Sequence, residues 1–178
     1  MREVDYAEAA KVSEKPSRVV LAVSFDRENG RCDIIALGWK MRTSIKPPMA
    51  AISVGKTRYS HGLILKEKEF ILAFPGGDIA REVLRCGTVS GRDFDKFSDT
   101  GLTPLDSKHV KPSLIAECPV NYECRVDGVL ETGDHTIFSG EVLASYLSKE
   151  KKLLVSAGED EGYRLILEEK GYRFAVVK

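Results

Sequence analysis

The sequence lacks an excess of charge of either sign. Lys plus Arg and Asp plus Glu each total 27 among 178 residues, so the formal net charge is zero. Proteins that bind nucleic acid or anionic membranes usually carry a clear surplus of basic residues. We therefore expect neither nucleic acid nor a membrane as a main partner, although a local basic patch would still be enough to bind one phosphate group.

Long apolar runs and closely spaced cysteines are also missing. No segment reaches the roughly 20 apolar residues that cross a bilayer, and residues 1–14 lack the apolar stretch of a signal peptide. The cysteines include no CxxC pair and no zinc-finger spacing to a His; they are Cys32, Cys86, Cys118 and Cys124. These absences predict a cytoplasmic protein without a metal site, in which reduced thiols behave as small apolar side chains.

Several nucleotide-binding and hydrolase motifs are absent as well. No G-x-G-x-x-G precedes a helix, and neither H-E-x-x-H nor G-x-S-x-G occurs. Gly55-Lys56-Thr57 resembles the end of a P-loop, but Ala50 stands where that motif needs an earlier glycine. The sequence therefore favours neither a Rossmann dinucleotide site nor a nucleoside triphosphatase.

What the sequence does contain is a series of short β-branched and aromatic runs separated by turn residues. They predict strands at 18–25, 32–39, 49–54, 70–74, 120–130, 135–147, 153–157, 163–167 and 172–177. The run 135–147 has apolar residues on both faces, which is typical of a strand buried on both sides for part of its length. Many strands and few helices predict a mainly β domain, a barrel or sandwich, over residues 1–178.

Only two helices are expected. Ser60 is a candidate cap for a helix at 60–66, and Asp78 for a helix at 79–86 that Gly87 would end. The longest irregular stretch is 92–119, and stretches of that length in a compact domain are usually functional.

The segment Gly55-Lys56-Thr57-Arg58-Tyr59-Ser60 has the composition of an anion site. Two cations, two hydroxyls and the free N–H groups at a helix start would suit a phosphate monoester. Taken alone, the segment is more typical of a solvated turn with a capping serine. The same alternative, an ordinary loop with one salt bridge, holds for the segment from Cys86 to Phe97, in which Ser90 and Lys96 are candidate ligands. By default, His135 is a structural residue and Trp39 a core residue.

Five segments in this order resemble the flavin reductase-like family over about residues 18–147. Ala36-Leu37-Gly38-Trp39 is similar to its N-x-x-T-x-G/S-W strand, and the stretch from Pro47-Pro48 to Gly55 to its P-P-x-x-x-x-S-x. Arg58-Tyr59-Ser60 resembles R/K-x-T/S. Residues 86–97 resemble C-G-x-x-S-G-R-x-x-D-K-F, and residues 133–142 resemble G-D-H-x-I-x-x-G-E-V. The usual Asn and Thr before the Trp are absent, so backbone groups would replace their contacts.

The resemblance implies an FMN-binding split barrel, Greek-key-like, with bound FMN and a homodimeric assembly. The residues that it assigns to the cofactor are Ala36, Leu37, Gly38, Trp39, Ser53, Val54, Gly55, Lys56, Thr57, Arg58, Ser60, Cys86, Gly87, Ser90, Gly91, Lys96 and Phe97. It places Lys96 beside the flavin ring edge and His135 near the flavin or the nicotinamide channel. No residue needs to act as an acid or base, because the flavin carries the redox chemistry.

The implied function is oxidoreduction through FMN. Electrons would pass from NAD(P)H or a partner protein to free flavin, ferric iron or another acceptor. A flavoredoxin-type electron carrier and a non-catalytic flavin-binding module remain as alternatives. A split barrel of the pyridoxamine-phosphate-oxidase type is a further one, against which the D-K-F and G-D-H segments argue.

Overall fold

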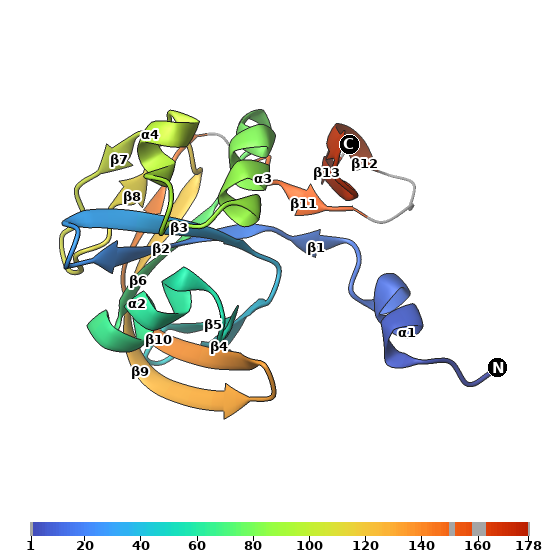
Figure 1. The fold of residues 1–178 in the computed structure, drawn as a ribbon, viewed down its shortest axis with the longest axis horizontal. Coiled ribbons are helices and arrows are strands. Elements are labelled where there is room, and N and C mark those ends of the chain that lie inside the picture. The colour runs from blue at the N-terminus through green and yellow to red at the C-terminus, as the bar shows by residue number, and fades with distance from the viewer. Residues whose placement is uncertain (1, 150–151, 158–162, 178) are drawn as a thin grey trace.

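The computed structural model describes residues 2–149, 152–157 and 163–177, and β-strands dominate it (Figure 1). Its helices are α1 (Tyr6–Ser13), α2 (Tyr59–Glu67), η1 (Gly77–Ile79), α3 (Ala80–Thr88) and α4 (Lys96–Thr100). Its strands are β1 (Ser17–Arg18), β2 (Val20–Asp26), β3 (Arg31–Leu37), β4 (Lys40–Ser44), β5 (Met49–Gly55), β6 (Glu69–Phe74), β7 (Pro104–Leu105), β8 (Leu114–Ile115), β9 (Val120–Thr132), β10 (His135–Leu147), β11 (Val155–Ser156), β12 (Tyr163–Glu169) and β13 (Tyr172–Val177).

Seven strands form the main sheet in the order β3-β2-β6-β9-β10-β5-β4, and each neighbouring pair is antiparallel. The sheet curls so that β3 near one edge contacts β5 near the other, and α2 packs against β2, β3 and β5. The result is a barrel whose opening is filled by a helix (Figure 1). The expected mainly β barrel with a few short helices is confirmed.

The two faces of the sheet build two apolar cores. On β2, Val20 and Ala22 face one core, and Leu21 and Val23 face the other, because successive side chains in a strand point to opposite sides. The inner core contains Phe70 and other side chains of the barrel interior, together with Ile64 of α2. The outer core lies under α3, α4, the 102–118 segment and the C-terminal hairpin.

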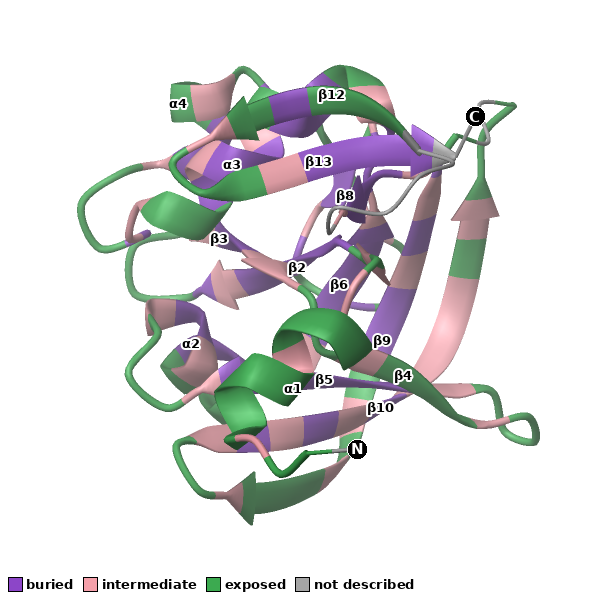
Figure 2. Ribbon diagram, turned by 90° about the vertical axis from the view of Figure 1, so that its right-hand side faces the viewer, coloured by how far each residue is buried: buried purple, intermediate pink, exposed green. Residues whose placement is uncertain are grey.

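A second sheet joins the two ends of the chain. Its order is β1-β11-β13-β12, so the short strand after α1 pairs with the segment that follows β10. In Figure 2, α1 lies in front of the barrel, below the β12–β13 hairpin. None of the α1 side chains is buried. Within the described residues, no helix is long and apolar enough to span a membrane.

All nine predicted strands are confirmed, with 135–147 and 172–177 correct at both ends. Along β10 the expectation of two buried faces holds only in part. Phe138 is fully buried, but Leu147 is 71% exposed. Register shifts interrupt β10 between Ser139 and Gly140 and between Val142 and Ala144, and such bulges change which face a side chain occupies.

The predicted helix caps are wrong. The N-cap of α2 is Arg58, without a side-chain hydrogen bond, and Ser60 instead donates to Asp33. Residue Asp78 lies in η1, and α3 continues through Gly87 to Thr88. Two further elements, α1 and β4, were not predicted, and α4, β7 and β8 lie inside the stretch expected to be irregular.

Candidate functional site

A cavity of about 690 Å³ lies where β3, β5 and α3 meet α1 and the C-terminal hairpin. Most of its lining residues are apolar or glycine, and a few polar side chains converge on it. Small-ligand and cofactor pockets typically occupy about 300–1,000 Å³ and have this mixed lining. The cavity is therefore the candidate site.

The apolar walls are supplied by β3 and α3. Ile35, Ala36 and Leu37 line the cavity from the strand, and Gly38 and Trp39 continue this wall beyond its end. Residues Val83, Leu84, Gly87 and Thr88 line it from the helix. A Cβ atom on Gly87 would lie 3.3 Å from Cβ of Ala36. The missing side chain thus lets the last turn of α3 approach the strand closely.

The polar wall comes from the end of β5 and the start of β10. Ser53, Gly55, Arg58 and His135 all line the cavity. Gly55 pairs with His135 across the two strands, and a Cβ on Gly55 would lie 3.5 Å from both Cγ of Arg58 and Nε2 of His135. These two side chains therefore approach the same glycine, so a cation and an imidazole stand side by side at the cavity.

His135 is held by its neighbours. Its Nδ1 lies 2.7 Å from Oδ1 of Asp134, and its ring centroid lies 4.6 Å from that of Trp39. The hydrogen bond to His135 holds the pKa of Asp134 below its usual value. Of the two ring nitrogens, Nε2 is the one nearer to Gly55.

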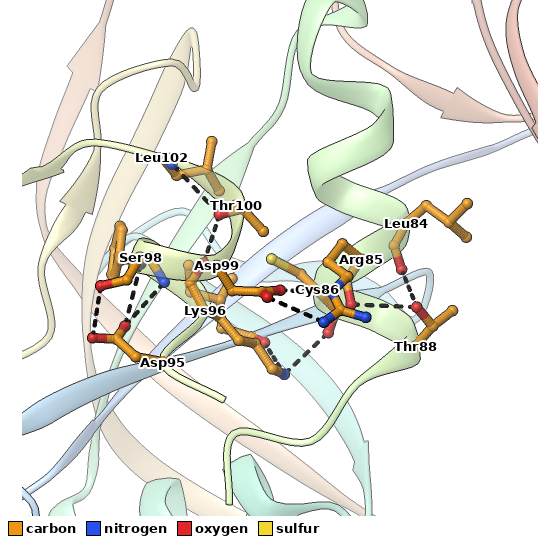
Figure 3. A network of polar contacts seen from close by, with 12 residues as sticks. Leu84, Arg85, Cys86, Thr88, Asp95, Lys96, Ser98, Asp99, Thr100 and Leu102 are labelled. Carbon is orange, nitrogen blue, oxygen red and sulfur yellow. Dashed lines mark hydrogen bonds and ion pairs between the residues drawn. The ribbon is translucent and has the colours of Figure 1, made fainter. Parts of the chain in front are cut away.

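Lys96 does not line the cavity. Its side chain is buried, and Nζ donates to the backbone oxygens of Ile34 and Cys86, the latter at 3.1 Å (Figure 3). Nζ also lies 3.1 Å from Oδ1 of Asp33. Its amino group is directed at these backbone and carboxylate oxygens, behind the cavity wall, and the expected contact with a flavin ring edge stays a prediction.

The other predicted site residues divide into those that do not border the cavity and those that do. Val54, Ser60, Cys86 and Phe97 are buried, and burial raises the pKa of the Cys86 thiol to about 12. Thr57, Ser90 and Gly91 do not border the cavity either. Of the predicted cofactor residues, the structure brings together at the cavity Ala36, Leu37, Gly38, Trp39, Ser53, Gly55, Arg58 and Gly87, with His135 beside them.

Lys56 lies outside the main cavity. It forms an exposed ion pair with Glu131 at 3.3 Å and lines a smaller hollow of about 270 Å³ beside α2. Arg58 borders both spaces, and Arg92 borders the smaller one with its guanidinium 5.1 Å from the Tyr59 ring centroid. Arg58 is therefore the residue of the predicted anion segment whose side chain connects the two spaces.

Both ends of the chain contribute to the cavity, which was not predicted from the sequence. Tyr6, Lys11 and Lys15 line the cavity from α1 and the residues after it, while Tyr172 and Phe174 line it from β13. Lys15 donates a hydrogen bond to Ser156, and burial lowers the pKa of this lysine. No local pattern marks these residues, because only the pairing of β1 with β11, and of β11 with β13, brings them to the cavity.

Comparisons with known proteins agree with this architecture. Residues 12–163 match the family model described as flavin reductase like domain. An uncharacterized protein of Archaeoglobus fulgidus is 38% identical over 129 residues, which cover 72% of this chain and 71% of that protein. Flavoredoxin from Methanosarcina acetivorans superposes with a TM-score of 0.78 at 25% identity, covering 100% of this chain and 91% of that one.

A third similarity adds a structure solved with a small carbonyl compound. The FMN-binding protein from Thermus thermophilus with bound p-hydroxybenzaldehyde has a TM-score of 0.78 at 22% identity, covering 99% of this chain and 96% of that one. At this identity the likeness supports the fold. Together with the match over most of the sequence, these findings place the chain in the flavin reductase-like family.

Proposed function

We propose that this protein is an FMN-dependent oxidoreductase. It takes electrons from NAD(P)H or a partner protein and passes them to free flavin, ferric iron or another acceptor. The observation that carries the proposal is the 690 Å³ cavity, on which the predicted residues of β3, β5, α3 and β10 converge. Membership of the flavin reductase-like family supports the same cofactor.

The donor set of the cavity fits FMN. A flavin ring is flat and largely apolar with a polar edge, and Ile35, Leu37 and Leu84 supply apolar walls for it. Ser53 and the backbone at Gly55 offer polar groups suited to the ring edge. Arg58 would hold the phosphate, because a guanidinium matches a phosphate in both charge and geometry.

When bound, the flavin supplies the hydride and electron transfer. The protein's own residues bind and orient it, and we assign none of them as an acid or base. His135 and Trp39 border the cavity with their rings in contact, and they would position the second reactant. The apolar walls exclude water from the ring.

The proposal is tested by the absorption spectrum of the purified protein and chromatography of the ligand released by heat. We expect a yellow protein that releases FMN. Anaerobic titration with NADH and with NADPH, followed at the flavin absorbance, should bleach the cofactor with at least one of them. A colourless protein that does not bind added FMN would exclude the proposal.

A second candidate is a flavoredoxin-type carrier that receives electrons from another protein. The similarity to the Methanosarcina acetivorans flavoredoxin over the whole chain favours it. The same titration separates the two functions. A flavin that neither nicotinamide reduces, but that dithionite reduces fully, indicates the carrier.

A further inference from the structure

A buried ion pair lies next to the cavity without lining it. Lys96 at the start of α4 is 2% exposed and Asp33 in β3 is also 2% exposed. Nζ and Oδ1 are 3.1 Å apart. Both charges are therefore withdrawn from water. Charges in the protein interior interact more strongly than charges at the surface.

Asp33 is held from several sides. Its Oδ2 accepts a hydrogen bond from Ser60 in the first turn of α2. Its Oδ1 has no hydrogen-bond partner among the described residues, so its contact with Lys96 is the ion pair alone. A Cβ atom on Gly91 would lie 2.1 Å from Oδ1, so the chain passes directly over this carboxylate.

The pair stands immediately behind the cavity wall. The carbonyls that bind Lys96 belong to Ile34 and Cys86, and the residues that follow them, Ile35 and Gly87, line the cavity. Figure 3 shows Lys96 reaching the end of α3 at Cys86. A net charge at this position would therefore act on a ligand in the cavity through one layer of backbone.

We propose that Asp33 neutralises Lys96 and thereby holds the reduction potential of the bound flavin below the value that an unpaired lysine would impose. The inference rests on the proposed FMN site. The reduced flavin carries more negative charge than the oxidised flavin, so a nearby positive charge favours the reduced form. Paired opposite charges act as a dipole, whose field weakens with distance faster than that of a single charge.

The test is the midpoint potential of bound FMN at pH 7 in two single variants and the double variant. Asp33→Asn keeps the shape and leaves Lys96 unpaired, so the potential should rise. Lys96→Met leaves Asp33 unpaired, so the potential should fall. Asp33→Asn/Lys96→Met removes both charges and should lie close to the wild type. The ratio between the affinities for reduced FMN and for oxidised FMN should change about tenfold in each single variant. Neighbouring charges commonly shift the pKa of a buried acid by a similar factor.

Thr100→Ala is the matched control, because it removes a hydrogen bond to the backbone oxygen of Lys96 but retains both charges. Its potential should equal that of the wild type. If Asp33→Asn does not fold, Lys96→Met and the double variant still decide, since only an electrostatic role predicts that removing the second charge restores the potential. Unchanged potentials in both single variants, or shifts in the same direction, would overturn the inference while leaving FMN binding intact. A wild type that binds no FMN would overturn the proposed function and this inference with it.

Discussion

Arg58 is the residue through which the site would recognise a phosphate. Arg58 borders the main cavity, and it forms no ion pair with any described residue. By contrast, Arg81 on α3 pairs with Glu169 and borders neither the main cavity nor the smaller hollow beside α2. A guanidinium that is not neutralised within the protein remains available for an anionic ligand.

Replacing Arg58 by Ala should therefore weaken FMN binding about 10- to 100-fold, since a hydrogen bond to a charged group contributes about 1.5–3 kcal/mol. Riboflavin lacks the phosphate and should bind almost as before. Fluorescence-quenching titrations with both ligands measure the difference, and Arg81→Ala is the control that should affect neither. Equal losses of affinity for FMN and riboflavin would show that another residue binds the phosphate, and Arg92 would be the next candidate.

Gly140 shows how tightly the barrel is packed beneath the site. A Cβ on this glycine would lie 3.0 Å from Cε1 of Phe70 and 3.2 Å from the backbone oxygen of Arg125. Neither contact is relieved by rotating a flexible side chain. Close packing therefore explains why a glycine occupies the first position of the G-E-V segment.

We expect Gly140→Ala to lower the free energy of unfolding by about 1–3 kcal/mol, the usual cost of overpacking a core. Urea unfolding followed by circular dichroism would measure it. Gly133→Ala in the β9–β10 turn is the matched control, because a Cβ there meets no atom within 4 Å. Equal stability of the two variants would contradict the packing argument.

At the scale of elements, a buried carboxylate anchors the long connection between α4 and β9. Glu123 in β9 accepts hydrogen bonds from the backbone N–H groups of Lys108, His109 and Val110, and from the Tyr146 hydroxyl. Asn121 holds the same connection through both backbone groups of Ile115. The 102–118 segment is thus tied to the sheet by polar side chains of one strand.

Glu123 makes this anchor sensitive to acid. Burial alone would raise its pKa, but the hydrogen bonds from Lys108, Tyr146 and His109 outweigh burial and hold the pKa below 4.5. A carboxyl group with a lowered folded-state pKa stabilises the protein above its unfolded pKa, and this contribution is lost as the pH falls through the folded value. The contribution is therefore complete at pH 7 and disappears below about pH 4.5.

Glu123→Gln should cost about 1–3 kcal/mol at pH 7, the range for leaving buried partners poorly satisfied. The difference from the wild type should shrink as the pH falls below 4.5, because the wild type then loses the same charge. Denaturant unfolding at a series of pH values would test this. A difference that stays constant from pH 7 to pH 3 would show that the charge of Glu123 is not what anchors the connection.

At the scale of the whole molecule, the outward face of β4, β5, β10 and β9 carries exposed apolar side chains. Met41 is 54% exposed and Leu130 is 60% exposed. Ile137 pairs with Leu130 on one side and with Ser53 on the other, so its side chain shares their face. Trp39 at the cavity mouth is also 54% exposed and borders a shallow hollow with Met41 and Ile137.

We propose that a second copy of the chain covers this face and forms a homodimer, since apolar patches of this kind usually mark an interface. Light scattering at micromolar concentration should give twice the 19.7 kDa of one chain. Met41→Glu should shift the protein towards the monomer, whereas Leu105→Glu on β7, in a different sheet, should not. A wild type that remains at 19.7 kDa would contradict the proposal.

The two ends of the chain also belong to the site at this scale. Residues as far apart in the sequence as Tyr6 and Phe174 border the same cavity. The family match extends from residue 12 to 163, beyond the range 18–147 that the sequence motifs cover. We propose on these grounds that residues 1–178 act as one domain. Removing either end should then affect ligand binding, not only stability.

The sequence by itself determined most of the strands, the mainly β barrel and the central walls of the cavity. These follow from local information: apolar periodicity marks β2, β5 and β10, and the motif residues Leu37, Gly55 and His135 lie on neighbouring elements of the barrel. Only the tertiary structure decided where Lys96 and Lys15 stand. Lys96 meets Asp33, 63 positions earlier, and Lys15 meets Ser156, 141 positions later. Which charges pair, and which side chains reach a cavity, depends on packing between distant segments, about which no local pattern carries information.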